Sequence, residues 1–139
     1  MYRVMLISHG ELAEAMLRTA EMIVGKKSQV QTFGLDLGDD VEEFRRRVTD
    51  AIAQILRQED LLVLTDIQSG SPFNVAVGAM VEHEFCHFTG MNLALTVEAL
   101  CGMEHRGLWE VVEELNELKG SSIINVNWFV EESMGDEED

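Results

Sequence analysis

Short apolar runs alternate along this chain with longer amphipathic segments, and this alternation restricts the fold more than any other feature. The clearest run, Leu61–Thr65, shows no polar alternation, as expected of a strand buried on both faces of a parallel sheet. Similar runs predict strands over Tyr2–Ser8, Gln29–Leu35 and Phe85–Thr89. Because the segments between them place apolar residues at helical spacing, the order indicates an open, doubly wound α/β sheet with helices on both faces.

The predicted helices begin and end at residues that suit those positions. Glu11–Val24 is closed by Gly25, Asp39 or Asp40 can cap a helix that runs to about Gln58, and Pro72 starts a helix that runs to Glu82. Two more helices are expected over Asn92–Cys101 and Leu108–Leu118, followed by a last strand over Ser122–Val130.

The strand order follows from the rule that parallel strands are joined by right-handed crossovers. If the first strand is central, the four parallel strands take the order 2-1-3-4, and the direction of winding switches between strands one and three. Ligands gather at the carboxyl ends of strands beside such a switch point. His9 directly follows the first strand and Asp66 the third, so we expect these side chains to meet there.

An imidazole beside a carboxylate is suited to phosphoryl transfer. The carboxylate of Asp66 would hold one ring nitrogen of His9 and leave the other as a nucleophile. Gly10 allows a close backbone approach, and the Ser69–Ser71 loop offers hydroxyl and N–H groups at a helix start, where anions bind. This pattern points to a transient phosphohistidine, although a lone histidine at a strand end is more often structural.

Other functions found on this architecture fit less well. A receiver domain needs an acidic cluster where this chain has Ser8-His9, and a dinucleotide site needs a richer glycine loop than SHGEL. No GxSxG nucleophile elbow is present in the sequence. His83 and His87 lie four residues apart but span a helix-to-strand boundary, so we expect two surface histidines rather than a metal site.

The formal net charge of −16 excludes nucleic acid and anionic membranes as natural partners and favours a basic protein. Six of the acids fall within residues 131–139, which are expected to form a disordered acidic tail after a domain over residues 1–130. Two cysteines are too few for a disulfide framework, and neither a signal peptide nor a spanning apolar run is visible. These features predict a cytoplasmic protein.

Three motifs, in order, carry a resemblance to a known family. The S-H-G after the opening strand, T-D-I-Q-S-G-S-P-F-N and G-M-N-L-A-L-T-V-E-A-L are similar to the IIA domain of the mannose-family sugar phosphotransferase system (PTS). The resemblance covers about residues 2–130. It implies a phosphoryl carrier that accepts phosphate from phospho-HPr on Nε2 of His9 and passes it to a separate IIB component, with no metal and no bound cofactor.

The resemblance also implies roles for further residues. Asp66 would orient His9, Asn92 would border the site, and Ser71 would lie in the phosphate loop; from their own positions, Gly10, Ser69 and Gly70 are expected to bind the phosphate as well. Partner contacts are expected at Met22, Gln68 and Phe73, although core packing is the simpler role for Met22 and Phe73. The stretch after Asp66 often carries an aromatic residue and a second glycine in well-known members, but here it reads Ile67-Gln68-Ser69-Gly70, which leaves the details of the docking surface open.

Members of this family form homodimers in which a C-terminal strand crosses into the partner's sheet. Ser122–Val130 is the candidate for that strand, since an apolar edge strand needs a neighbour; pairing within its own chain is the alternative. The membrane would be involved only through IIC and IID components. A phosphotransfer subunit of a dihydroxyacetone kinase system, or a regulatory phosphorylation sensor, would use the same His9. The sequence does not reveal which sugar is transported.

Overall fold

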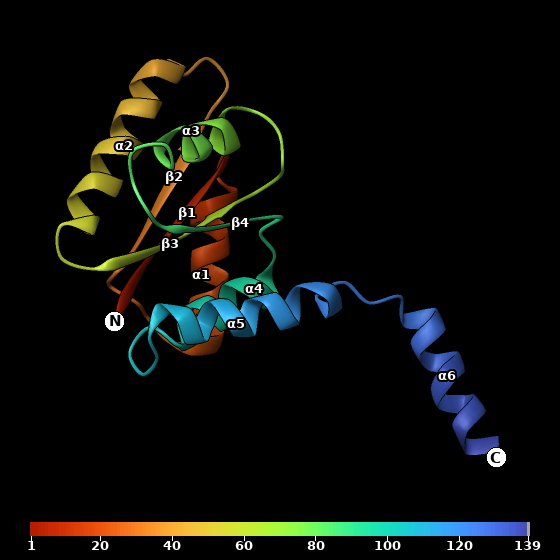
Figure 1. Ribbon diagram of the computed structural model, residues 1–139. Helices are drawn as coiled ribbons and strands as arrows, with labels where there is room; N and C mark the ends of the chain where they lie inside the picture. Colours follow the sequence, from red (N-terminus) through yellow and green to blue (C-terminus); the bar gives the residue numbers. More distant parts are fainter. Residues whose placement is uncertain (139) are drawn as a thin grey trace.

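The computed structural model describes residues 1–138 and contains a four-stranded sheet, six α-helices and one 3₁₀ turn (Figure 1). In chain order the elements are β1 (Tyr2–His9), α1 (Leu12–Val24), β2 (Val30–Leu35), α2 (Val41–Leu56), β3 (Asp60–Thr65), α3 (Ser71–Ala79), β4 (Cys86–Thr89), α4 (Leu93–Cys101), α5 (Leu108–Leu118), η1 (Lys119–Ser121) and α6 (Val126–Glu138).

All four strands are parallel and lie in the order β2-β1-β3-β4, which confirms the predicted 2-1-3-4 arrangement. β1 and β3 are central, with Ile7 opposite Thr65. On its other side β1 pairs with β2, so that His9 stands opposite Leu35. The carboxyl ends of β1 and β3 therefore meet at the switch point.

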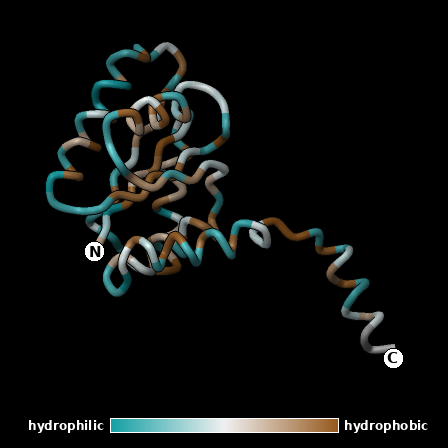
Figure 2. Tube along the Cα trace, viewed as in Figure 1, coloured by the Kyte–Doolittle hydropathy of each residue, from teal (hydrophilic) through white to brown (hydrophobic). Residues whose placement is uncertain are grey.

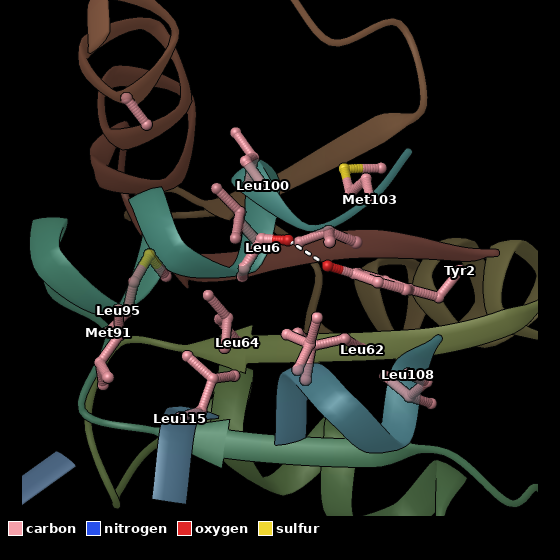
Figure 3. Packing of buried hydrophobic residues seen from close by; sticks show 14 of the residues in the cluster. Tyr2, Leu6, Leu62, Leu64, Met91, Leu95, Leu100, Met103, Leu108 and Leu115 are labelled. Carbon is pink, nitrogen blue, oxygen red and sulfur yellow. Dashed lines mark hydrogen bonds between the residues drawn. The ribbon is translucent and has the colours of Figure 1, made fainter. Parts of the chain in front are cut away.

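Helices cover both faces of the sheet (Figure 1), because alternate residues of the central strands are apolar on both sides. Val4 and Leu6 of β1 face the core formed with α1, α4 and α5, whereas Met5 and Ile7 face the core formed with α2 and α3. In the first core, the buried Tyr2 hydroxyl donates a hydrogen bond to the carbonyl oxygen of Ala99 at 2.6 Å (Figure 3). This bond satisfies a polar group that would otherwise be costly to bury.

Side chains at the helix starts explain where two of the helices begin. Asp40, one of the two caps considered from the sequence, accepts hydrogen bonds from the N–H groups of Glu42 and Glu43 at the start of α2. Such a cap contributes about 1 kcal/mol. α1 is capped instead from the preceding strand, because the buried Ser8 hydroxyl accepts a bond from the Ala13 N–H at 2.8 Å.

The predicted strand over Ser122–Val130 is wrong in this structure. Ser122–Asn125 has no regular structure, and helix α6 begins at Val126. Asn125 provides a physical reason, because its Oδ1 accepts bonds from the N–H groups of Asn127 and Trp128 and so caps a helix. Without a neighbouring strand, a helix is the way for this segment to satisfy its own backbone.

The C-terminal segment, residues 122–138, leads away from the rest of the chain, and α6 extends away from the sheet and its helices (Figure 1). Residues 131–138, expected as an acidic tail, belong to α6, and Asp139 lies outside the described residues. The stretch leading into α6 is hydrophobic (Figure 2). Within residues 1–138, every helix is too short or too polar to cross a bilayer.

Candidate functional site

His9 ends β1 at the carboxyl edge of the sheet, with 47% of its side chain exposed. The strand stops there because Gly10 turns the chain with a φ of 56° and donates its N–H to the Leu35 carbonyl at 2.8 Å. This hydrogen bond brings the backbone at Gly10 close to the end of β2, where a Cβ on Gly34 would overlap the carbonyl oxygen of Gly10. Gly34 therefore shapes the site, although nothing in its own sequence context indicated this role.

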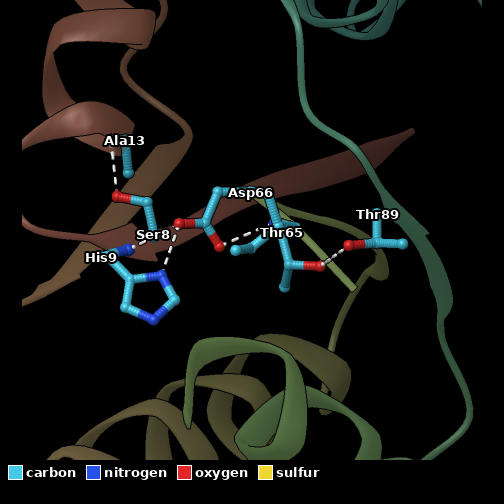
Figure 4. Close-up of polar contacts among 7 residues, drawn as sticks. Ser8, His9, Ala13, Thr65, Asp66 and Thr89 are labelled. Atoms are coloured by element: carbon cyan, nitrogen blue, oxygen red, sulfur yellow. Dashed lines mark hydrogen bonds and ion pairs between the residues drawn. The ribbon is translucent and has the colours of Figure 1, made fainter. Parts of the chain in front are cut away.

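Asp66 directly follows β3, and its nearly buried carboxylate reaches His9 (Figure 4). Oδ2 accepts a hydrogen bond from the His9 backbone N–H at 2.8 Å and lies 2.8 Å from Nδ1 of the His9 ring. Oδ1 accepts the Ile67 N–H at 2.9 Å. The structure thus brings together the two residues that the strand order placed at the switch point.

Burial acts to raise the pKa of the Asp66 carboxyl, but the bonds from the His9 backbone, the His9 ring and the Ile67 N–H outweigh it and lower that pKa below its ordinary value. An ionised carboxylate only accepts hydrogen bonds, so Nδ1 of His9 must carry the proton. In the neutral form of the ring, Nε2 then has the free lone pair. The arrangement can therefore present Nε2 as a nucleophile.

Nε2 of His9 faces the start of α3. A Cβ built on Gly70 would lie only 2.7 Å from Nε2, so this position has room only for glycine while the ring keeps its place. Gly70 also adopts a φ of 87°, which side chains rarely allow. The N–H groups of Ser71 and Phe73, the first and third residues of α3, point out of the helix end toward this region.

The loop between β3 and α3 contains the other predicted phosphate-binding residues. Ser69 and Gly70 are exposed, and Ser71 is half-buried at the first position of α3. Pro72 at the second position has no N–H and favours the helix start. A helix N-terminus of this kind attracts anions, and the neighbouring serine hydroxyls can donate hydrogen bonds to oxygens held there.

Asn92, predicted at the border of the site, is the N-cap of α4. Its Oδ1 accepts the Leu95 N–H at 3.0 Å, and its Nδ2 donates to the Gly90 carbonyl and the Ser122 hydroxyl, each at 3.3 Å. The preceding Met91 donates its N–H to the Thr65 carbonyl at 3.0 Å, which brings this turn beside the end of β3. The amide of Asn92 is thus engaged in fixing the turn.

The three predicted partner contacts lie in different surroundings. Gln68 is exposed beside Asp66, but Phe73 is half-buried and packs its ring toward His87. Met22 is 85% exposed but lies ten residues beyond the start of α1, about 15 Å along the helix away from the His9 end. The structure therefore separates Met22 from His9.

Three exposed aliphatic side chains that the sequence reasoning missed follow the carboxyl ends of β1, β2 and β3, the edge of the sheet at which His9 lies. Each lies two or three residues beyond a strand end, and each is exposed: Leu12 by 42%, Leu37 by 105% and Ile67 by 53%. Exposed large apolar residues near a reactive group are typical of a docking surface. Their position just after the strand ends was the available signal.

Comparison with known proteins identifies the family. The family model EIIA-man, described as "PTS system fructose IIA component", matches residues 3–116. The chain belongs to this family of PTS IIA components. The resemblance to the mannose-family IIA domain seen in the sequence is thereby confirmed.

Individual EIIA relatives agree with the family match. The chain is 32% identical over 94 residues to the mannose-specific EIIAB component of Escherichia coli, a match that covers 67% of this chain but only 29% of that longer protein. It is 27% identical over 123 residues to the fructose-specific EIIA component of Bacillus subtilis, covering 88% and 82% of the two chains. The chain is thus a phosphotransferase-system component of the EIIA type.

A solved EIIA structure has the same fold. The PTS IIA protein associated with the fucose utilization operon of Streptococcus pneumoniae superimposes with a TM-score of 0.80 at 30% identity, and the match covers 93% of this chain and 96% of the other. The agreement extends the family match from the sequence to the whole arrangement of strands and helices.

Proposed function

We propose that this EIIA component carries a phosphoryl group on Nε2 of His9, accepted from phospho-HPr and passed to a IIB component during sugar uptake. The observation that supports the proposal best is the 2.8 Å contact between Asp66 Oδ2 and His9 Nδ1, because it directs the lone pair of the ring to Nε2. On this proposal the carrier domain covers residues 1–130 and works in the cytoplasm.

The transfer needs one bond to form as another breaks. The Nε2 lone pair of His9 forms the new N–P bond while the N–P bond of the donor phosphohistidine breaks, and the electron pair of that bond stays on the donor nitrogen. The His9 ring gains positive charge as it attacks. Asp66, held ionised by its hydrogen bonds, keeps the Nδ1 proton in place and stabilises that charge.

The phosphoryl oxygens would be held by the start of α3. Nε2 of His9 faces this helix start at Gly70, and the N–H groups of Ser71 and Phe73 and the hydroxyls of Ser69 and Ser71 belong to the same turn. These groups can donate hydrogen bonds to the doubly negative phosphoryl group, and the helix N-terminus favours negative charge at this place. Neither a metal nor a cofactor is needed for this step.

The partner would bind over the exposed aliphatic residues around His9. Leu12, Leu37 and Ile67 give an apolar contact, and exposed acids stand among them at Glu11 and Asp36. With a net charge of −16, the chain attracts a donor whose phosphohistidine is flanked by basic residues. Gln68 would lie at the edge of the same contact.

A second copy of the chain would cover the C-terminal segment. Ile123, Ile124, Trp128 and Phe129 are between 56% and 87% exposed, which is unusual for apolar residues so close together in sequence. We therefore propose a homodimer in which this segment is buried. Sedimentation equilibrium of the full chain should give a dimer, and the double substitution W128E/F129E should give a monomer.

The test of function is phosphorylation in a reconstituted system. With enzyme I, HPr and labelled phosphoenolpyruvate, the protein should acquire an acid-labile, base-stable label that His9→Ala abolishes. His105→Ala, which removes an exposed histidine between α4 and α5, is the control and should keep full labelling. Full labelling of the His9→Ala variant would contradict the proposal. Chasing the label into a IIB component or a dihydroxyacetone kinase subunit separates the two acceptors.

A further inference from the structure

His87, expected from the sequence to be a surface histidine, is half-buried and bonded to the end of β3. Its Nε2 lies 2.8 Å from the Thr65 hydroxyl oxygen, which in turn lies 2.9 Å from the Thr89 hydroxyl oxygen. Thr65 is fully buried and is the last residue of β3, immediately before Asp66. Figure 4 shows the part of this network that joins Thr65 to Thr89.

The other side of the His87 ring meets α3. The rings of His87 and Phe73 have centroids 5.7 Å apart and planes inclined by 43°, within the range of favourable aromatic pairs. Phe73 lies in the first turn of α3, whose N-terminus faces Nε2 of His9. One imidazole thus contacts both elements from which the site is built: the strand that carries Asp66 and the helix that would hold the phosphoryl oxygens.

We propose that His87 is a positioning residue for phosphoryl transfer, which fixes the carboxyl end of β3 and the first turn of α3 relative to each other around His9. This inference rests on the proposed function of His9. Asp66 adjoins Thr65, so a shift of the strand end moves the carboxylate that orients the His9 ring. Small displacements of orienting groups have large effects on rate.

The hydrogen bonds are consistent with a neutral His87. Burial lowers the pKa of its imidazole, so the ring has a single N–H near neutral pH. If that proton is on Nε2, His87 donates to Thr65, and the Thr65 hydroxyl is free to donate to Thr89. The Nε2 proton of His87 and the hydroxyl proton of Thr65 then each have an acceptor, as buried polar groups require.

Two amide substitutions separate positioning from mere space filling. The side-chain nitrogen of glutamine is as many bonds from Cβ as Nε2 of histidine, so His87→Gln can keep the bond to Thr65. The amide of His87→Asn ends one bond earlier and cannot reach Thr65. We expect the Asn variant to lower kcat for phosphorylation by phospho-HPr about tenfold with an unchanged KM, and the Gln variant to stay within about twofold of wild type.

Thr65 provides a second, independent comparison. Thr65→Ser keeps the hydroxyl and should behave as wild type, whereas Thr65→Val removes it at almost the same volume and should lower kcat as His87→Asn does. This pair decides the question if the His87→Asn variant does not fold, as judged by circular dichroism and thermal unfolding.

The outcomes distinguish this inference from the proposed function. If wild-type protein is phosphorylated but folded Asn and Gln variants, or Val and Ser variants, have equal kcat, the positioning role is wrong. A change confined to KM would also overturn it, since that would place His87 in docking. If wild-type protein takes up no phosphoryl group at all, the proposed function itself fails.

Discussion

Gly70 lies so close to the ring of His9 that a Cβ at this position would lie 2.7 Å from Nε2 and 2.9 Å from Cε1. The side chain that glycine lacks would occupy the space that an incoming phosphorus needs. The identity of residue 70 is therefore tied to the chemistry of residue 9. The two are far apart in sequence and meet because β1 and β3 are neighbours.

Gly70→Ala should lower the phosphorylation rate of His9 at least about 100-fold, because the new methyl group blocks Nε2 or displaces the ring. Gly70 has a φ of 87° and a ψ of −178°, a region essentially restricted to glycine, so the backbone strain of alanine should also reduce the unfolding free energy by about 1–3 kcal/mol. Gly25→Ala is the matched control, since Gly25 has a φ of 88° and a ψ of 167°, close to those of Gly70, but open space around it. It should show a similar stability loss and normal phosphorylation; equal rates in both variants would show that Nε2 is not blocked.

Asp66→Asn should slow phosphorylation by roughly 100-fold or more, because a neutral amide no longer stabilises the charge on the His9 ring or secures its tautomer. Rapid-quench measurement of the transfer from phospho-HPr gives the rate. Asp60→Asn, at the exposed start of the same strand, should leave it unchanged. If the Asp66→Asn variant is phosphorylated as fast as wild type, Asp66 has no role in the transfer and only caps the end of the strand.

The lowered pKa of Asp66 also predicts a pH dependence of stability. A carboxyl whose pKa is lower in the folded than in the unfolded protein stabilises the fold above the unfolded value, near 3.8, and this contribution disappears as the pH falls through the folded value. Urea unfolding of wild type and Asp66→Asn should therefore differ most above about pH 4 and converge in more acid solution. A difference that stays constant from pH 6 to pH 2.5 would mean that the Asp66 pKa is not lowered.

Leu37→Glu should raise the KM for phospho-HPr about tenfold with little change in kcat, because Leu37 lies two residues beyond the strand partner of His9 and is fully exposed. Met22→Glu introduces the same charge at the distant end of α1 and should leave KM nearly unchanged. If Met22→Glu has the larger effect, the partner docks along α1 and the contact around His9 is assigned incorrectly.

The strand order could be predicted because it follows from an uninterrupted apolar strand and from the handedness of the connections between parallel strands. Leu61–Thr65 can be buried on both faces only in the middle of a parallel sheet, and right-handed crossovers then leave few arrangements. The proximity of His9 and Asp66 follows from that order. Sequence patterns can therefore locate site residues that directly follow the strands of a parallel sheet, because the strand order alone decides which of them are neighbours.

The features that were missed depend on three-dimensional packing. His87 was interpreted as a surface histidine because it and His83 span a helix-to-strand boundary, but its partners Thr65 and Phe73 come from β3 and α3. Gly34 gives no local signal because its constraint comes from Gly10, across the β1–β2 pair. At the C-terminus, the apolar run Ser122–Val130 favoured a strand, but within residues 1–138 no strand lies beside it, and the Asn125 cap begins a helix at Val126.

The central claim is that Nε2 of His9 receives the phosphoryl group while Asp66 holds Nδ1. Heteronuclear NMR of the imidazole nitrogens in protein phosphorylated by HPr tests it directly, since phosphorus couples to the nitrogen to which it is bonded. The phosphorus should couple to Nε2 of His9, with the Nδ1 proton retained in a hydrogen bond. Coupling to Nδ1 of His9, or to any other histidine, would contradict the mechanism.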